Sequence, residues 1–143
     1  MRRHGAYLVL LVVLVLACAG TAPNILYVQA GPAGVSSRQL EINDRFIERT
    51  VGFGDISISP LDSTGQFETQ VILTNLSDRD VAFEYRFMWY DARGFELSNV
   101  TSWLPGILGA KESKGFRSVT PAAGASSFKL MVRKPHPVTP TGS

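Results

Sequence analysis

Cysteine and histidine are scarce in this sequence of 143 residues, which contains one cysteine, Cys18, and two histidines, His4 and His136. A Ser/His/Asp or Cys/His catalytic site needs a histidine in a defined place, whereas His136 stands between two prolines near the end of the chain. Structural zinc sites need several cysteine or histidine ligands, and a single cysteine forms no internal disulfide. The sequence therefore predicts no catalytic residue, no metal ligand, no cofactor and no disulfide framework.

An excess of charge of one sign is also absent. The chain has 14 Lys and Arg residues against 12 Asp and Glu residues. Two of the arginines, Arg2 and Arg3, precede an apolar segment, and without them the basic and acidic residues are equal in number. Binding to nucleic acid depends on a basic surface that neutralises phosphates. We therefore expect no nucleic-acid partner.

The longest apolar run, 6–16, is shorter than the about 20 residues of a membrane-spanning helix. Its length and the preceding Arg2 and Arg3 are typical of a secretory signal peptide. The run ends in Val15-Leu-Ala-Cys18, which resembles the lipobox of bacterial lipoproteins, although Leu16 replaces the usual small residue. This resemblance implies cleavage after residue 17 and lipidation of Cys18.

Lipidation of Cys18 would attach the chain to a membrane. Stable attachment to a membrane needs about two hydrophobic groups. A triacylated cysteine of this type carries more lipid chains than that. In lipoproteins of this kind an Asp after the cysteine favours the inner membrane, so Ala19 indicates the periplasmic face of the outer membrane. We thus predict a signal peptide over 1–17 and a membrane partner reached through Cys18.

Glycine, proline and small residues are frequent in 18–37, which predicts a flexible tether between the lipid anchor and the folded domain. An apolar stretch, 25–28, interrupts this segment and is interpreted as loosely ordered linker rather than as a short strand. Prolines and a lack of apolar groups in 134–143 predict a disordered tail. The folded domain is therefore expected to span 38–133.

Alternation of apolar and polar residues predicts β-strands along this domain. The clearest case is 81–89, and other cases are 66–75 and 127–133. A short polar loop joins 66–75 to 81–89, which favours a hairpin, and 91–94 reads as a turn. The large apolar side chains on one face of the clearest strand are expected to fill the core: Val81, Phe83, Tyr85, Phe87 and Trp89.

The remaining segments predict shorter strands separated by turns. We read 40–53 as a strand and 54–59 as a second, short strand. We read 95–103 as a weak strand ended by Pro105-Gly106, and the polar 111–119 as an edge strand. About seven strands without a helix predict an all-β fold. The strand spacing favours a single antiparallel β-sandwich of immunoglobulin-like type, preceded by the lipoprotein signal peptide.

Three segments resemble the YcfL-type bacterial lipoproteins. They are the Asn75-Leu-Ser turn, the aromatic run EYRFMWYDARGFEL at 84–97, and FKLMVR at 128–133. The resemblance covers about 55–133, which is most of the domain. It implies a periplasmic lipoprotein with an immunoglobulin-like β-sandwich, and it carries no established catalytic residues.

Paired carboxylates near turns are the remaining candidates for hydrolysis of a saccharide. Asp55, Asp91 and Glu96 lie at such positions. Asp91 opens a four-residue turn, where an aspartate accepts hydrogen bonds from the following backbone N–H groups, and we interpret it in that role. Asp78 and Asp80 lack the oxygen-rich spacing of calcium loops and are interpreted as solvated turn residues.

Aromatic residues outside the core face are candidates for a binding surface. Tyr90 has the opposite parity to Trp89, Phe95 follows the turn, and Trp103 lies at a predicted strand end. These rings could stack on a sugar. The polar edge strand is another candidate, where a partner could add by backbone pairing or where polarity prevents such addition.

These observations lead to one expected function and two alternatives. The first is a non-catalytic, lipid-anchored envelope protein, an adaptor or accessory factor with a protein partner in the periplasm. The second is a peptidoglycan- or saccharide-binding module that uses Tyr90, Phe95 and Trp103. The third and most remote is a carboxylate-based hydrolase.

Overall fold

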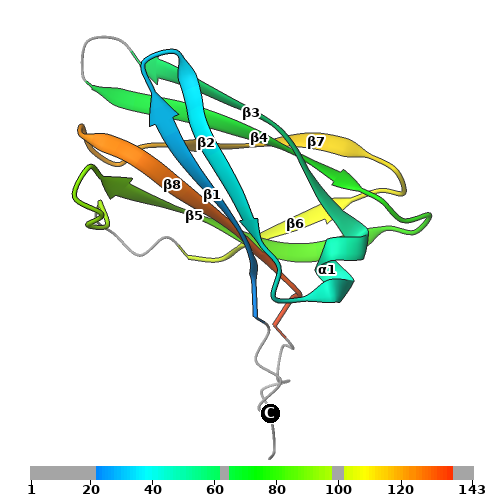
Figure 1. Cartoon of the computed structure of the whole chain (residues 1–143). Helices are drawn as coiled ribbons and strands as arrows, with labels where there is room; N and C mark the ends of the chain where they lie inside the picture. The colour runs from blue at the N-terminus through cyan, green and yellow to red at the C-terminus, as the bar shows by residue number, and fades with distance from the viewer. Residues whose placement is uncertain (1–21, 62–64, 98–101, 137–143) are drawn as a thin grey trace, which may run out of the picture.

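The computed structural model describes residues 22–61, 65–97 and 102–136, which form two antiparallel β-sheets packed face to face (Figure 1). The predicted signal peptide, 1–17, and Cys18 lie outside the described residues. The five-stranded sheet has the order β2-β1-β8-β5-β6, and the three-stranded sheet has the order β3-β4-β7. The expected all-β sandwich is confirmed, and the described residues form eight strands, against about seven expected, and one short helix. The elements are β1 (Asn24–Gly31), β2 (Gly34–Glu41), α1 (Arg45–Thr50), β3 (Val51–Leu61), β4 (Gln66–Asn75), β5 (Val81–Asp91), β6 (Leu104–Leu108), β7 (Ser113–Val119) and β8 (Ala125–Arg133).

The alternating strand predicted from the aromatic run is β5, which lies inside the five-stranded sheet between β8 and β6. Phe83, Phe87 and Trp89 are buried, and Tyr85 is half-buried against the same core. The Trp89 indole Nε1 donates a hydrogen bond to Ser118 Oγ at 3.1 Å, so the polar atom of this buried ring is paired. The prediction that this face of the strand packs in the core is confirmed.

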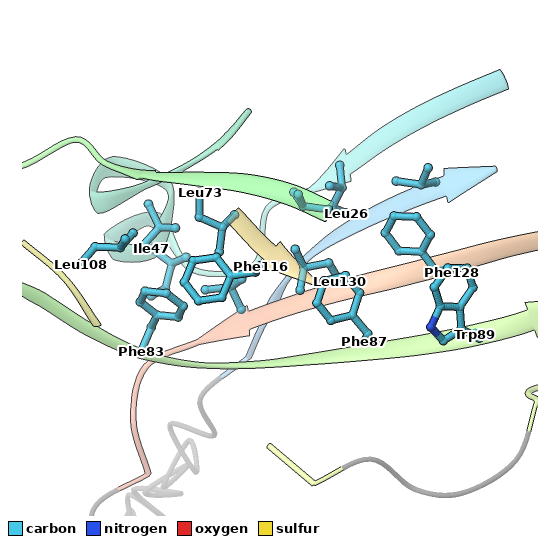
Figure 2. Close-up of a cluster of buried hydrophobic side chains, with 14 of the residues drawn as sticks. Leu26, Ile47, Leu73, Phe83, Phe87, Trp89, Leu108, Phe116, Phe128 and Leu130 are labelled. Atoms are coloured by element: carbon cyan, nitrogen blue, oxygen red, sulfur yellow. The ribbon is translucent and has the colours of Figure 1, made fainter. Parts of the chain in front are cut away.

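The core between the two sheets is largely aromatic at its centre (Figure 2). The ring centroid of Phe116, on β7, lies 5.6 Å from that of Phe83 and 4.8 Å from that of Tyr85, both in edge-on geometry. On the five-stranded sheet, the rings of Phe128 and Trp89 lie 5.0 Å apart. Such contacts add about 0.5–1.5 kcal/mol to the gain from burial. Rings from both sheets therefore hold the sandwich together.

β1 and the first half of β2 form a hairpin from residues that we predicted to be a flexible tether. That prediction is wrong for 24–37, because Gly31, Pro32 and Gly34, which suggested a linker, lie at the hairpin turn. Gly34 there has a φ of 116°, which favours glycine. β1 pairs with β8 on its other side and buries Leu26 and Val28. The folded domain therefore begins at Asn24 instead of residue 38.

A short helix, α1, replaces part of the strand predicted at 40–53. Asp44 caps it, since Oδ1 accepts hydrogen bonds from the backbone N–H groups of Phe46 at 2.8 Å and Ile47 at 3.4 Å. Ile47 is fully buried, so packing stabilises a helix that is too short to be stable alone. Within the described part of the chain, no helix has the length and apolar character needed to cross a membrane.

β4 and β5 do not form the hairpin expected from the short loop between them, because they belong to different sheets. β4 pairs with β3 and β7, whereas β5 pairs with β6 and β8. Asn75, at the end of β4, is fully buried. Its Nδ2 donates to the carbonyls of Arg79 and Leu108, and its Oδ1 accepts from the Ser77 N–H. These bonds fold the loop back onto the end of β6 and so direct the chain into the other sheet.

The weak strand predicted at 95–103 is replaced by β6, which contains the Pro105 and Gly106 that were expected to end it. Pro105 is tolerated because β6 lies at an edge of its sheet and needs no second neighbour. Gly106 lies against the Phe83 ring, where a Cβ would approach Cε2 to 2.5 Å. The polar edge strand predicted at 111–119 is confirmed as β7.

The first three residues of the predicted disordered tail, 134–143, are placed against the domain. The Lys134 ammonium lies 3.3 Å from Asp44 Oδ2, and the backbone N–H of His136 donates to Glu84 Oε1 at 3.0 Å. The prediction of disorder is therefore wrong for these residues, because an ion pair and a hydrogen bond hold them. The rest of the tail lies outside the described residues.

Candidate functional site

The outward face of the five-stranded sheet gathers aromatic and basic side chains from three neighbouring strands. Antiparallel pairing sets Tyr27 of β1 opposite Lys129 of β8. On β5, Arg86 and Tyr90 have the parity opposite to that of the buried aromatic residues, so they also point away from the core. We call the surface formed by Tyr27, Arg86, Tyr90, Trp103 and Lys129 the outer face.

Lys129 lies between two tyrosine rings on the outer face. Its Nζ is 5.1 Å from the ring centroid of Tyr27 and 4.9 Å from that of Tyr90. These distances are within the range of cation–π attraction. A hollow of about 250 Å3 opens beside the rings, and Gln29 and Ser127 also line it. The ammonium is therefore held between two aromatic rings that carry no formal charge.

The phenol of Tyr27 connects this cluster to a carboxylate. Its hydroxyl donates to Glu41 Oε2 at 2.8 Å, and Asn43 Nδ2 donates to Oε1 at 3.0 Å. The bond from Asn43, then the bond from Tyr27 and the attraction of Lys129, outweigh partial burial and lower the pKa of Glu41. The same bond to Glu41 raises the pKa of Tyr27. Glu41 is thus an ionised acceptor that is already engaged.

Trp103 lies between two arginines at the other end of the outer face. The guanidinium carbons of Arg133 and Arg86 are 3.9 and 4.9 Å from its ring centroid. Arg133 also pairs with Glu84, with Nε 3.1 Å from Oε1, so its charge is balanced. Arg86 donates from Nη2 to Met131 Sδ at 3.8 Å, and its buried Nε has no hydrogen-bond partner among the described residues.

Arg86 and Lys129 are therefore the two cations of the outer face that form no ion pair with a carboxylate in the part of the chain that the structure describes. Glu41 is nevertheless near enough to attract Lys129. The register of β5 and β8 makes them diagonal neighbours, a relation that places Cα atoms about 7–8 Å apart. Glu41 and Glu84, on the same face, are each engaged by other groups. Two cations at this spacing suit an acidic ligand.

The three aromatic residues predicted as a binding surface do not form one continuous shelf. Tyr90 and Trp103 lie at different ends of the outer face, and each has a cation over its ring. Phe95 lies in the turn after β5, is 63% exposed, and has the Arg93 guanidinium 5.2 Å from its ring centroid. A sugar could stack on the covered faces of these rings only if the cations moved.

The carboxylates considered for hydrolysis either stabilise the turn after β5 or lie exposed. Asp91 Oδ1 accepts from the backbone N–H groups of Arg93 at 2.9 Å and Phe95 at 3.0 Å, as predicted for a turn residue. Partial burial opposes its charge, but these bonds outweigh the burial and lower the pKa of Asp91. A general acid needs a raised pKa, so this shift has the opposite sign. Asp55 and Glu96 are exposed.

The acidic residues of the loop between β4 and β5 are also exposed. Asp78 and Asp80 face solvent there, in agreement with their interpretation as turn residues. No group of three or more His, Cys, Asp or Glu side chains that could hold a metal ion occurs within 22–61, 65–97 and 102–136.

A second hollow, of about 700 Å3, lies at the end of the sandwich beside the β1–β2 turn. Its walls come from that turn, β3, β4 and β8, and they include Ile58, Pro60 and Phe67. No titratable side chain of the described residues lines it. This hollow therefore offers apolar contact and few groups that would orient a polar ligand.

Sequence reasoning missed three members of the outer face, Tyr27, Arg86 and Lys129. Tyr27 lay in the segment interpreted as a tether, although the continuous apolar run 25–28 is also consistent with a short buried strand. Arg86 and Lys129 could be assigned to the polar faces of their strands, but nothing in the sequence places those strands side by side.

Residues 38–134, more than half of the chain, match a family described as protein of unknown function, DUF1425. The chain belongs to the DUF1425 family. The match begins inside β2, so β1, which supplies Tyr27 to the outer face, precedes the residues that define the DUF1425 domain.

The fold agrees with that of another DUF1425 protein. The crystal structure of a family member from Shewanella sp. pv-4 has a TM-score of 0.54 and 20% identity, and the similarity covers 76% of this chain and 96% of that chain. The crystal structure of Campylobacter jejuni cj0090 has a TM-score of 0.47 and 22% identity, covering 55% of this chain and 80% of that chain. No curated protein matches the sequence. The Shewanella structure therefore supports the fold, and the activity must be argued from the outer face.

Proposed function

We propose that this DUF1425 protein is a non-catalytic, lipid-anchored adaptor of the bacterial cell envelope that binds an acidic partner through the outer face. The anchor is Cys18, on the periplasmic face of the outer membrane. The Val15-Leu-Ala-Cys18 sequence after an apolar run, followed by Ala19, supports this location. The segments shared with the YcfL-type lipoproteins support the finer placement within the DUF1425 family.

The observation that carries the proposal is the pair of cations Arg86 and Lys129, which form no ion pair among the described residues. The rings of Tyr27, Tyr90 and Trp103 hold them in place. Cation–π contact leaves the positive charge available, and a side chain that is already held loses little freedom when a partner binds. Two such cations on neighbouring strands favour a partner that presents carboxylates at a matching spacing.

The remaining groups of the outer face support recognition rather than proton transfer. Glu41 accepts hydrogen bonds from Tyr27 and Asn43, and Glu84 accepts one from Arg133. Carboxylates that are already engaged leave no free general base on this face, which supports the non-catalytic part of the proposal.

Capture of partners from envelope extracts tests this function. Full-length tagged protein in mild detergent is compared with the Arg86→Gln/Lys129→Gln double variant. Lys114→Gln, which removes an exposed cation of β7 in the other sheet, is the matched control. Loss of two charge-assisted contacts should reduce recovery of a specific partner by about tenfold or more, whereas the control should match the unmodified protein.

Salt dependence separates charge recognition from apolar association. Raising the ionic strength from about 0.1 to about 1 M shortens the screening length from about 10 to about 3 Å, so recovery should decline. Equal recovery by the double variant would contradict the assignment of the outer face. Recovery of no protein partner at all would contradict the adaptor function itself.

A saccharide-binding module is the second candidate, and the hollow beside Tyr27 and Tyr90 favours it because two aromatic walls border that space. This function predicts that the protein sediments with purified peptidoglycan. Tyr27→Ala/Tyr90→Ala should reduce sedimentation, and Phe95→Ala, in the exposed turn, tests the third ring. Failure of the unmodified protein to sediment would end this candidate.

A further inference from the structure

The chain enters the domain at one corner of the sandwich, beside α1 (Figure 1). Asn24, the first residue of β1, is fully buried, and its Nδ2 donates to the Asp44 carbonyl at 3.0 Å. Its Oδ1 accepts from the backbone N–H groups of Asn43 at 2.8 Å and Asp44 at 2.7 Å. The entry point is therefore attached to the residues that begin the helix.

The residue after β8 is attached to the same corner. Lys134 Nζ lies 3.3 Å from Asp44 Oδ2 and 5.2 Å from the ring centroid of Phe46. Asp44 also caps α1 through its other carboxylate oxygen. Asp44 thus joins the start of β1 through its backbone, and the helix and the residue after β8 through its side chain. Figure 1 shows these three parts of the chain close together.

The stretch between the lipidation site and this corner is short. Asn24 follows Cys18 by six residues, and six residues of fully extended chain span at most about 20 Å. The tether is much shorter than the 18–37 segment expected from composition. Given the lipid anchor of the proposed function, on which this inference rests, the corner that carries α1 must lie close to the membrane surface.

The surface of α1 has residues suited to that position. Phe46 is 51% exposed. Arg45 and Arg49 are exposed on the same helix, with Glu48 as an exposed acidic residue between them, and Lys134 lies over the Phe46 ring. Aromatic and basic side chains together are typical of segments that rest at the level of the lipid headgroups.

We propose that α1 forms a docking face for the phospholipid leaflet that holds the anchor. Phe46 enters the headgroup region and Arg45 and Arg49 bind lipid phosphates, while Lys134 stays paired with Asp44 beside the Phe46 ring. Because β1 begins and β8 ends at this corner, both strands extend away from the membrane surface. The outer face is then directed parallel to the membrane plane. Docking therefore sets the height and orientation at which the outer face meets its partner.

A fluorophore at position 46 tests this docking. With Cys18 lipidated, the full-length chain has no other thiol, so Phe46→Cys offers a single labelling site. Val35→Cys, beside the β1–β2 turn at the opposite end of β1, is the matched control, since Val35 is 40% exposed. Both are placed in vesicles of phosphatidylethanolamine and phosphatidylglycerol. The label at 46 should shift its emission to the blue and lose quenching by iodide, whereas the label at 35 should remain quenched.

Flotation of the vesicles and mass spectrometry of the N-terminal peptide report anchoring in the same samples. Protein that floats but has equal iodide quenching at 46 and 35 would refute the docking face and leave the anchor intact. Protein that does not float and carries an unmodified Cys18 would refute the anchor, and this inference with it. Arg45→Gln/Arg49→Gln in the labelled chain should reduce the blue shift, and an unchanged shift would refute the role of the basic residues.

Discussion

Replacing Asn75 by alanine should lower the free energy of unfolding by about 3–5 kcal/mol, because this buried amide holds three segments together. Its Nδ2 donates to the carbonyls of Arg79 at 2.6 Å, Gly109 at 2.9 Å and Leu108 at 3.1 Å. Its Oδ1 accepts from the Ser77 backbone N–H at 2.9 Å and the Ser77 hydroxyl at 2.7 Å. Alanine supplies none of these groups.

The magnitude follows from the number of bonds and from what stays buried. Each neutral hydrogen bond contributes about 0.5–1.5 kcal/mol net, and each buried group left without a partner costs about 1–3 kcal/mol. Water can reach the more exposed of the released groups, so one buried carbonyl carries the full penalty. The resulting loss is a large share of the about 5–15 kcal/mol that stabilises a typical domain.

Equilibrium unfolding in urea, followed by tryptophan fluorescence, measures this loss. For a slope of about 1–3 kcal/mol/M, the midpoint should fall by about 2 M. Thr74→Ala is the control on the same strand, because its hydroxyl is 2.6 Å from Ser113 Oγ in an exposed pair and its loss should change stability by less than about 1 kcal/mol. A midpoint for Asn75→Ala within about 0.5 M of the unmodified protein would refute the reasoning.

Three other changes test separate parts of the structure. Gly106→Ala should lower stability by about 1–3 kcal/mol, because its Cβ would lie 2.5 Å from the Phe83 ring, and an unchanged Tm would contradict that close approach. The pKa of Asp91 is lower in the folded state than in the unfolded state, so the ionised carboxylate stabilises the fold. This stabilisation is fully present above the unfolded pKa of about 3.9 and is lost as the pH falls through the folded pKa. Urea midpoints measured against pH should therefore decline less in acid for Asp91→Asn, and equal declines would argue against this residue as the cause. Arg38→Met should speed amide hydrogen exchange in β2, because the guanidinium donates to two carbonyls of β3 at 2.9 and 3.0 Å. Unchanged exchange would show that these bonds do not stabilise β2 at the edge of its sheet.

The faces of the strands could be predicted from the sequence because they depend only on neighbours along the chain. On β5 and β8, the period of two places Phe87 and Leu130 inside and Arg86 and Lys129 outside, as the structure confirms. The Asp91 turn was predictable for the same reason, since its carboxylate and the N–H groups that it binds lie within four residues. The lack of placed histidines and the signal-like N-terminal residues are likewise properties of the sequence itself.

The partners of each strand were decided by the tertiary structure. Alternation fixes which side chains share a face, but it leaves open which strand supplies the backbone donors and acceptors on either side. β4 and β5 follow each other in the chain and lie in different sheets, whereas β1 and β8, from opposite ends of the domain, pair directly. That pairing brings Lys129 over Tyr27, and the pairing of β8 with β5 brings it over Tyr90. The outer face therefore exists only once contacts between distant segments have formed, and no local pattern of residues specifies them.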